Sequence, residues 1–489
     1  MKKTGVEFRT TNEQLQKIYD AGEKVCLGNI RDFDGKRVLI EGGGYLSMWP
    51  ETQPMAGEMY AKRDLEIAVN NQTIFLDYQL PNGRLPGMIS MNTTGISASY
   101  GWLQGLCFPQ HALNMYYLAE LDQAYLERLY DAFSRYDDYL WRTRDSDGNG
   151  CLEMWCEWDT GEDNSSRTRG MHHAWGRDIP PEPGHGHAPQ ESMDMMGYSY
   201  VLRDVLAQIS GILENREEEY WKAKAQQVAD KVRDYLWVDK RGACFDRDEN
   251  NELIDVLIHN NLRMMYFGVF SQKMADRFVK EHLLNPEEFW TPMPLPSIAI
   301  NDPMFENTEG NSWAGNPQGL TFQRSIYALE RYGYFAQITH IGRCLAEAVG
   351  KYLKFSQGYD PLTKEAKGSG LDDYGPTALA MLEMIALAYG VDIRAREIDF
   401  CAADSEDEWI YTQIWGDDRY TLKKSGDLAE VYINDRKRFD FTLGFRVVTD
   451  RQGNLLYVVR IEETDAEFKL NGKEYGMLSC NERVLLKYQ

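Results

Sequence analysis

Residues 318–354 read QGLTFQRSIYALERYGYFAQITHIGRCLAEAVGKYLK and contain two helical patterns separated by only two residues. Apolar side chains recur every three or four residues over 318–332 and again over 335–354, which predicts two helices. Because the connection is so short, the two helices are expected to be antiparallel neighbours, each burying its apolar face against another element. The stretch therefore predicts a helical hairpin within a larger helical domain.

The same pattern extends over most of the chain up to residue 392. Several of the predicted helices come as close pairs, such as 108–120 with 123–142 and 193–214 with 216–237. No regular sequence period relates the pairs, which argues against a solenoid of near-identical repeats. A closed ring of about six hairpins is the natural alternative. The predicted helices are 12–27, 58–80, 108–120, 123–142, 193–214, 216–237, 257–270, 273–284, 318–332, 335–354 and 374–389.

After about residue 400 the pattern changes to short alternating runs separated by turn residues. The runs 408–415, 439–448 and 454–461 are typical of strands. We expect residues 1–400 to form the helical domain and residues 401–489 to form a small antiparallel β module resembling a sandwich. Segment 390–404 is short and poor in Gly, Ser and Pro, so the module is expected to dock on the helices.

Composition excludes several classes of partner. Acidic side chains outnumber basic ones by 76 to 53, and the 489-residue chain has a formal net charge of −23. Such a surface repels phosphate backbones and anionic lipid, so we expect neither nucleic acid nor membrane as a partner. No run approaches the ~18 apolar residues that span a bilayer, and no apolar run marks a signal peptide. We expect a cytoplasmic protein with free, buried cysteines; the sequence indicates no oligomeric state.

Residues 145–167, DSDGNGCLEMWCEWDTGEDNSSR, crowd several carboxylates around two tryptophans. Carboxylates in a partly apolar loop repel each other, which raises pKa values and suits acid catalysis. A solvated acidic loop or a calcium loop is the alternative. Asp145, Asp147 and Asn149 match the start of a calcium loop, but the twelfth position is Cys156 instead of Glu.

The segment DTGEDNSSR, residues 159–167, resembles the acid-bearing signature of glycoside hydrolase family 63, the trehalases and the mannosylglycerate-hydrolase-like six-hairpin glycosidases. The resemblance implies a mainly α, (α/α)6 toroid and an inverting α-glycosidase. It also implies that Asp163 is the general acid, with Ser165 and Arg167 at flanking structural positions. Similar segments follow the family's order at 79–86, 295–305, 311–315, 328–333, 358–363 and 374–379.

One position departs from the family pattern. The family's general base is a Glu two residues before a Tyr-Asp-Pro segment, and this chain has Gln357 there, which cannot take a proton. Another carboxylate is then expected to act as the base. Glu309 and Asp373 rank equally as candidates, with Glu365 also nearby. A protein that binds sugar without cleaving it is the alternative.

Aromatic and polar side chains in the long loops are expected to contact the substrate, because flat apolar rings with polar edges suit sugars. Two of these candidates have structural alternatives: Arg63 can form an ion pair with Asp64 or Glu58, and Asp194 lies where a helix begins. The expected substrate contacts are Trp49, Glu51, Tyr60, Arg63, Asp64, Trp158, Asp194, Trp313, Gln318, Gln357 and Tyr359.

The sequence thus favours a glycosidase that hydrolyses O-glycosidic bonds in a small carbohydrate substrate with two carboxylates. The chain has no Gly-rich nucleotide loop, and we expect no organic cofactor. We also expect no catalytic metal, because the histidines at 172, 173, 185 and 187 lack the spacing of a zinc site and fit a mobile loop better. A lyase or terpene cyclase on a similar toroid is the more distant alternative.

Overall fold

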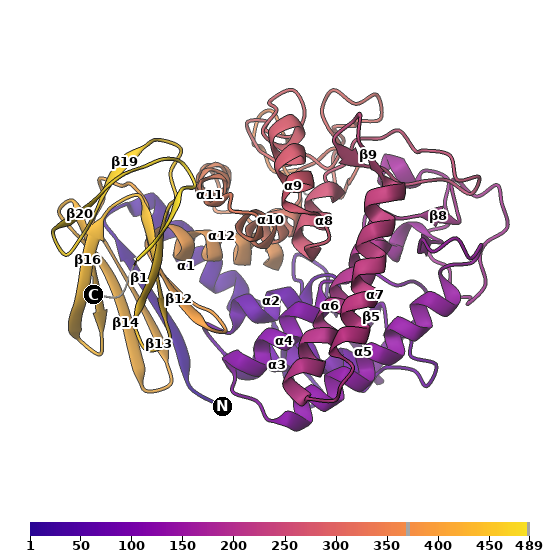
Figure 1. The fold of residues 1–489 in the computed structure, drawn as a ribbon, viewed down its shortest axis with the longest axis horizontal. Coiled ribbons are helices and arrows are strands. Elements are labelled where there is room, and N and C mark those ends of the chain that lie inside the picture. The colour runs from indigo at the N-terminus through magenta and orange to yellow at the C-terminus, as the bar shows by residue number, and fades with distance from the viewer. Residues whose placement is uncertain (368–371, 487–489) are drawn as a thin grey trace.

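Most helices and the two largest sheets occupy separate parts of the protein. The structure, a computed structural model, describes residues 1–367 and 372–486. The helices form the larger part, and the strands of the C-terminal region stack beside them together with the N-terminal strand (Figure 1). The described helices are α1 (Glu13–Gly28), α2 (Gln53–Tyr60), α3 (Leu65–Asp77), α4 (Phe108–Leu118), α5 (Gln123–Thr143), α6 (Met193–Leu213), α7 (Glu218–Lys231), α8 (Asn260–Phe267), α9 (Gln272–Phe278), α10 (Gly319–Arg331), α11 (Phe335–Gly350) and α12 (Gly375–Tyr389).

The helical part is built from consecutive helices that pack against each other. Helices α4 and α5, α6 and α7, and α10 and α11 form such pairs, as the short connections predict. Helix α1 packs against α11 and α12, so the first and last helices are neighbours. Helix α12 is buried from Gly375 to Ala388, because α1, α10, α11 and strands of the β module surround it.

One predicted helix is in fact two. The apolar pattern over 58–80 predicts a single helix, but α2 ends at Tyr60 and α3 begins at Leu65. The carboxylate of Asp64 accepts hydrogen bonds from the backbone N–H groups of Glu66 and Ile67, at 3.0 and 3.2 Å. A carboxylate at this position satisfies amides that have no partner in a preceding turn, and it therefore starts a new helix.

Two antiparallel sheets form the β module. The larger has the strand order β1-β13-β14-β15-β16-β19-β20, and the smaller has the order β11-β12-β17-β18-β21. The strands are β1 (Thr4–Thr10), β11 (Val391–Ile393), β12 (Glu397–Ala402), β13 (Trp409–Trp415), β14 (Asp418–Ser425), β15 (Leu428–Ile433), β16 (Arg436–Thr442), β17 (Phe445–Asp450), β18 (Leu455–Arg460), β19 (Ala466–Leu470), β20 (Lys473–Leu478) and β21 (Arg483–Leu485).

The division predicted at residue 400 does not follow the sheets. Strand β1 pairs with β13 along its whole length, from Thr4 opposite Trp415 to Thr10 opposite Trp409. Strands β11 and β12 also enter the smaller sheet before residue 401. A single seven-residue strand carries no local signal for a partner so distant in the chain, because register is set by contacts made only in the folded sheet.

Buried ion pairs join the β module to the helices. Glu330 of α10 lies 2.7 Å from Arg394 and 2.5 Å from Arg446 of β17. Arg394 also lies 3.0 Å from Asp399 of β12. Burial alone raises the pKa of Glu330, but the two guanidinium groups outweigh burial and lower that pKa. The module is therefore docked on the helices, as the short connecting segment predicts.

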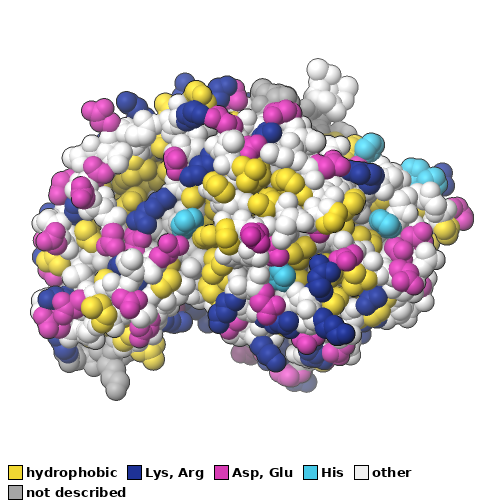
Figure 2. Space-filling view, turned by 90° about the horizontal axis from the view of Figure 1, so that it is seen from above, with side chains coloured by type: hydrophobic (Ala, Val, Ile, Leu, Met, Phe, Trp, Pro, Cys, Tyr) yellow, Lys and Arg dark blue, Asp and Glu magenta, His cyan; other side chains and the backbone are white. Residues whose placement is uncertain are grey.

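The surface is charged and mixed. Acidic and basic side chains alternate over the face in Figure 2, with apolar side chains gathered near its centre. None of the described helices is both long enough and apolar enough to cross a membrane. All eight cysteines are free thiols, and all but Cys480 are buried.

Replacing Glu330 by Ala is expected to lower the free energy of unfolding by about 3 kcal/mol, because the buried guanidinium of Arg446 and the partly exposed guanidinium of Arg394 lose a shared carboxylate. Urea unfolding followed by circular dichroism measures this change. Glu309→Ala is the matched control: the Glu309 side chain is 79% exposed, and its loss should cost at most about 1 kcal/mol. Equal unfolding midpoints for the two variants would rule out the proposed role of Glu330.

Candidate active site

A cavity of about 340 Å³ lies among loops that are far apart in the sequence. Three carboxylates line this one space, and four tryptophans form much of its wall. The lining residues are Glu41, Tyr45, Trp49, Glu51, Met88, Trp102, Gln104, Trp158, Gly161, Asp163, Trp313, Gln357 and Tyr374.

A larger cavity of about 460 Å³ lies between the helices and the β module. Carboxylates in that cavity are already paired: the Lys62 ammonium lies 2.6 Å from Glu383 and 2.9 Å from Asp392. Charges neutralised in this way hold the two parts of the protein together. We therefore place the candidate active site in the smaller cavity, which Asp163 lines.

Glu41 lies in the loop between β3 (Lys36–Leu39) and β4 (Ser47–Met48). Three glycines with positive φ follow it. At Gly43, φ is +60° and a Cβ atom would lie only 3.1 Å from the Cα atom of Tyr374. Glycine therefore lets this loop pass close to the start of α12, which brings Glu41 next to Tyr374.

A buried arginine holds the loop that carries Asp163. Arg167 lies 2.7 Å from Glu162 and 2.6 Å from Asp194 of α6, and it also pairs with Asp246. Glu162 directly precedes Asp163, so the same ion pairs fix the backbone at Asp163. Arg167 thus has the structural position that the family resemblance implies.

Neighbouring carboxylates in this loop have opposite electrostatic environments. Burial opposes the charge of Glu162, but Arg263 at 2.7 Å and Arg167 outweigh burial and hold its pKa well below the usual range. Asp163 has no ion pair among the described residues. Burial, followed by the charge of Glu157, raises the pKa of Asp163 to about 6. A carboxyl that keeps its proton close to neutral pH suits general acid catalysis.

The two glutamates of the cavity also bind protons more tightly than usual. Burial raises the pKa of Glu41 to about 8 against the effect of a hydrogen bond from Tyr374, and the charges of Glu51 and Asp163 add to the rise. Burial raises the pKa of Glu51 to about 7, although Arg324 opposes it. The three carboxyls share one cavity, so they titrate as an interacting group.

Asp163 and Glu41 each have one oxygen held and one oxygen available. The Asn311 side-chain amide donates to Asp163 Oδ2 at 2.6 Å, and the Tyr374 hydroxyl donates to Glu41 Oε1 at 2.6 Å. Within the described residues, no hydrogen bond reaches Asp163 Oδ1 or Glu41 Oε2. Each carboxyl can therefore exchange a proton with a ligand or a water through its second oxygen.

Glu51 is held at both oxygens. The Gln104 amide donates to its Oε1 at 2.8 Å, and Arg324 donates to its Oε2 at 3.1 Å. The backbone of Gly161 also packs against it: φ is +74° there, and a Cβ atom would lie 2.1 Å from Glu51 Oε2. Glu51 therefore supports the loop that carries Asp163.

Tryptophans give the cavity flat apolar walls. The rings of Trp49 and Trp102 have centroids 6.4 Å apart, and those of Trp102 and Trp158 meet edge to face at 5.0 Å. Trp313 lines the same cavity. Flat rings beside a few polar groups are suited to the apolar faces and hydroxyls of a sugar.

Gln357, at the position of the family's base, also lines the cavity. Its Oε1 accepts a hydrogen bond from the Tyr45 hydroxyl at 3.0 Å. The Asn311 amide reaches that hydroxyl at 3.4 Å and also donates to Asp163. This chain of hydrogen bonds links Gln357 to the predicted acid, but the amide itself takes no proton.

The structure brings together five of the predicted substrate contacts with Asp163, and places three others among the helices. Tyr60 is buried within α2. Arg63 pairs with Glu23 of α1 at 2.5 Å, a different partner from those considered in the sequence. Asp64 caps α3 and lies 2.9 Å from Arg37. The five that line the cavity are Trp49, Glu51, Trp158, Trp313 and Gln357.

The remaining three predicted contacts are buried outside the cavity lining. Asp194 is fully buried and neutralises Arg167. The Gln318 amide donates to the Ser312 carbonyl at 2.9 Å. Tyr359 is buried, and its hydroxyl accepts a hydrogen bond from a backbone N–H at 3.2 Å. These side chains support the surrounding loops.

Neither predicted base lines the cavity. Glu309 is exposed and lies 2.9 Å from Lys367. Asp373 is exposed too, although the next residue, Tyr374, does line the cavity. The structure therefore gives no support to the prediction that Glu309 or Asp373 faces Asp163 across the cavity. Proximity to a family motif in the sequence does not determine which side chain of a loop points inward.

Glu41 is the main residue that sequence reasoning missed. Its signal was a short apolar strand ending at a carboxylate, followed by three glycines (LIEGGG, 39–44). Such a glycine run indicates a strained loop or a close backbone contact. The other missed lining residues are Tyr45, Met88, Trp102, Gln104 and Tyr374.

The proposed calcium loop makes internal turn contacts. Asp145 Oδ1 accepts a hydrogen bond from the N–H of Gly150 at 3.1 Å, and Asp147 Oδ1 accepts one from the N–H of Asn149 at 3.1 Å. Such contacts form in Asx-type turns without any ion. Calcium binding at Asp145, Asp147 and Asn149 stays a prediction.

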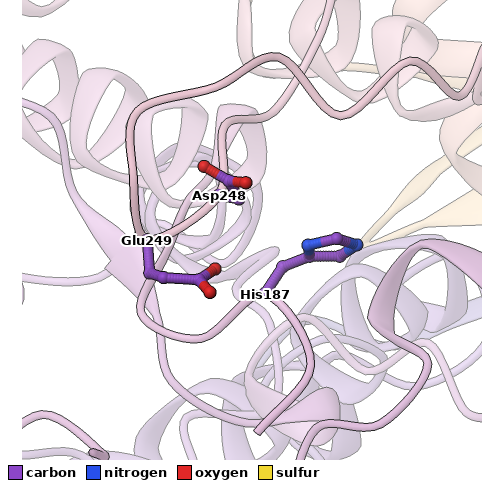
Figure 3. A group of neighbouring side chains, drawn as sticks. All are labelled: His187, Asp248 and Glu249. Atoms are coloured by element: carbon purple, nitrogen blue, oxygen red, sulfur yellow. The ribbon is translucent and has the colours of Figure 1, made fainter. Parts of the chain in front are cut away.

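Another group comes closer to the geometry of a metal site. In Figure 3, His187 from one loop faces Asp248 and Glu249 from another. The three ligand atoms lie within 4.8 Å of one another, and no other such group of three exists in the part of the chain that the structure describes. The group does not line the cavity, and we assign it no part in the chemistry there.

Comparison with known families identifies the chain. Residues 55–375, well over half of the chain, match the model of the mannosylglycerate hydrolase MGH1-like glycoside hydrolase domain. The chain belongs to this family. Within this MGH1-like domain lie Asp163 and Gln357, whereas Glu41 and Glu51 precede the matched segment.

Solved structures share the fold of this MGH1-like protein at low sequence identity. A family 63 mannosylglycerate hydrolase from Thermus thermophilus, in complex with glucose, is 17% identical with a TM-score of 0.61, over 74% of this chain and 99% of that one. A neutral trehalase from Saccharomyces cerevisiae is 12% identical with a TM-score of 0.54, over 74% and 79%. An α-L-rhamnosidase from Dictyoglumus thermophilum is 13% identical with a TM-score of 0.59, over 88% and 44%. The fold is therefore of the six-hairpin glycosidase type.

The pKa of Asp163 is expected to respond in opposite directions to two substitutions. Glu157→Gln removes a neighbouring negative charge and should lower this pKa from about 6, whereas Asn311→Ala removes a hydrogen bond to the carboxylate and should raise it. Carbon-13 NMR titration of aspartate-labelled protein measures both, with Asp163→Asn identifying the signal. If the pKa of Asp163 moved in the same direction in both variants, the effects assigned to Glu157 and Asn311 would be wrong.

Proposed function

We propose that this protein is an inverting α-glycosidase that hydrolyses the O-glycosidic bond of a small glycoside or oligosaccharide, with Asp163 as general acid and Glu41 as general base. The main support is that both carboxyls line one tryptophan-walled cavity, each with one oxygen available. The proposal includes a closed ring of helical hairpins, supported by the packing of α1 against α11 and α12.

The two carboxyls divide the chemistry between them. Asp163 gives its proton to the glycosidic oxygen as the bond from that oxygen to the anomeric carbon breaks. A water attacks the anomeric carbon from the opposite face, and Glu41 Oε2 takes a proton from this water. The aglycone leaves as an alcohol and the sugar as a hemiacetal. Exchange with solvent takes the proton from Glu41 and supplies one to Asp163; because the pKa of Glu41 is the higher of the two, this active protonation state is the minor one.

Glu41 suits the role of base better than Glu51. A general base needs a free oxygen to accept the proton of the attacking water. Each oxygen of Glu51 already accepts a hydrogen bond, from Gln104 or from Arg324, whereas Glu41 Oε2 accepts none among the described residues. The Arg324 guanidinium also stabilises the charged form of Glu51. We therefore assign Glu51 to positioning the Asp163 loop.

The related solved structure is named a mannosylglycerate hydrolase and holds glucose. We therefore propose α-glucosides and α-mannosides as the first substrates to test, followed by α-galactosides.

A sugar-binding protein without hydrolytic activity is the second candidate function. Gln357 favours it, because this side chain lines the cavity at the family's base position and only forms hydrogen bonds. Glu41 distinguishes the two functions: hydrolysis requires its carboxylate, whereas binding alone does not.

Asp163→Asn and Glu41→Gln are each expected to reduce kcat on unactivated α-glycosides by about 10²–10⁴-fold, because each removes a proton-transfer group. Glycosyl fluorides separate the two roles, since fluoride leaves with little help from an acid. Asp163→Asn should keep most of its activity on these fluorides, whereas Glu41→Gln should remain impaired. Initial rates of sugar and fluoride release provide the measurements.

The matched controls are Asp373→Asn and Glu309→Gln, which change the same functional groups outside the cavity and should retain wild-type kcat. If Asp163→Asn lost activity on glycosyl fluorides while Glu41→Gln kept it, Glu41 would be the general acid and Asp163 the general base. Full activity of Glu41→Gln on both substrate types would remove Glu41 from the mechanism.

The pH dependence of kcat/KM is expected to be bell-shaped, with limbs near pH 6 and pH 8 set by the pKa values of Asp163 and Glu41. Below about pH 6 both carboxyls are protonated and no base is present, whereas above about pH 8 both are ionised and no acid is present. Tyr374→Phe removes a hydrogen bond that lowers the pKa of Glu41, so it should move the alkaline limb to higher pH. An alkaline limb that stays in place or falls would contradict the Tyr374–Glu41 contact.

A further inference from the structure

We propose that the cavity accepts glycosides with an uncharged aglycone and rejects glycosides of acids. The proposal rests on the proposed function, because it assumes that the cavity binds a glycoside. Three carboxylates line the cavity, those of Glu41, Glu51 and Asp163, and its described lining includes no Lys, Arg or His. An anionic aglycone would therefore enter a space with negative groups and no cation of its own.

The nearest buried cations are already paired. Arg324 lies 3.1 Å from Glu51, and Arg263 lies 2.7 Å from Glu162. Both guanidinium groups are buried behind these carboxylates, and neither lines the cavity. Proteins that recognise a carboxylate usually offer it the free fork of an arginine. Among the described residues, this cavity provides no such group.

The imidazole of His173 is an exposed basic group next to a residue that lines the cavity. It stacks on Trp158 with ring centroids 5.5 Å apart and pairs with Glu157, and its side chain is 70% exposed. A side chain that pairs with a carboxylate and faces solvent offers little to a buried anion. A variant of His173 is tested separately below.

The rejection of anions should depend on pH. Burial raises the pKa values of Asp163, Glu51 and Glu41 to about 6, 7 and 8, so all three are charged only above about pH 8 and all are neutral below about pH 6. An ordinary aglycone carboxylate, with a pKa of about 3.5, stays ionised throughout this range. The repulsion is therefore strongest at alkaline pH. The charged or titratable groups that face the three carboxyls are Glu157, Glu162 and His173, Arg324 and Arg263, and Tyr45 and Tyr374.

Calorimetry on the wild-type protein with matched ligand pairs tests this inference. Each pair is a thio-linked α-glycoside of glycerol and the same glycoside of glycerate, with glucose, mannose or galactose as the sugar; the thio linkage resists hydrolysis. At pH 8.5 the glycerate member is expected to bind at least about tenfold more weakly than the glycerol member. At pH 5.5 the two members should differ in affinity by less than about threefold, because the lining carboxyls are then neutral.

Three variants identify the source of the effect. Glu51→Gln removes one negative charge from the lining and should reduce the difference in affinity between the glycerol and glycerate members at pH 8.5. Glu309→Gln removes a charge outside the cavity and should leave this difference in affinity unchanged. His173→Gln should retain the pH dependence, which would show that the lining carboxyls produce it. Loss of the pH dependence in His173→Gln would contradict that assignment.

Equal or tighter binding of the glycerate member at pH 8.5 would overturn the inference and leave the proposed hydrolysis intact. Binding of neither member of any pair would overturn the inference together with its premise that the cavity holds a small glycoside. The expected binding difference without turnover of the O-linked glycerol glycosides would support charge selection and overturn the proposed hydrolysis.

Discussion

The guanidinium group of Arg167 is 1% exposed and is shared by carboxylates from three parts of the chain, Glu162, Asp194 and Asp246. A charge so far from water is tolerated only when its partners are present with good geometry. The ion pairs therefore fix the loop that carries Asp163, helix α6 and the loop after β10 (Ala243–Cys244) relative to one another. Asp163 follows Glu162 directly, so its place in the cavity depends on the same cluster.

This constraint gives two adjacent carboxylates opposite electrostatic environments. Glu162 faces the arginines and stays ionised, whereas Asp163 faces away from them and its pKa rises to about 6. Glu41 reaches the same cavity from a glycine-rich loop, where burial raises its pKa to about 8. Between these two values the pair holds about one proton. The order of the two pKa values leaves that proton mainly on Glu41, so hydrolysis would proceed through the minor state in which Asp163 holds it and Glu41 is ionised. A lining that lacks free cations leaves those carboxyls unneutralised, and this is also the feature that disfavours an anionic ligand.

Local sequence patterns predicted the helices and singled out Asp163, which lines the cavity, because apolar spacing and the motif around Asp163 depend on only a few residues. They did not predict contacts between distant segments. Glu41 lines the same cavity as Asp163 only because a loop near the N-terminus folds against α12, and β1 pairs with β13 only in the folded sheet. Asp373 and Tyr374 show the limit most clearly: they are neighbours in sequence, yet one is exposed and the other lines the cavity. The direction of a loop side chain is set by packing, which the sequence pattern does not contain.

The central claim is that Asp163 and Glu41 act on opposite faces of the sugar, with a water between Glu41 and the anomeric carbon. Proton NMR during hydrolysis of an α-glucoside or α-mannoside tests it directly, because the anomeric signal of the first-formed sugar appears before mutarotation mixes the two forms. The account predicts that the β-anomer appears first. First release of the α-anomer would show that a carboxylate attacks the sugar itself, and would contradict the account.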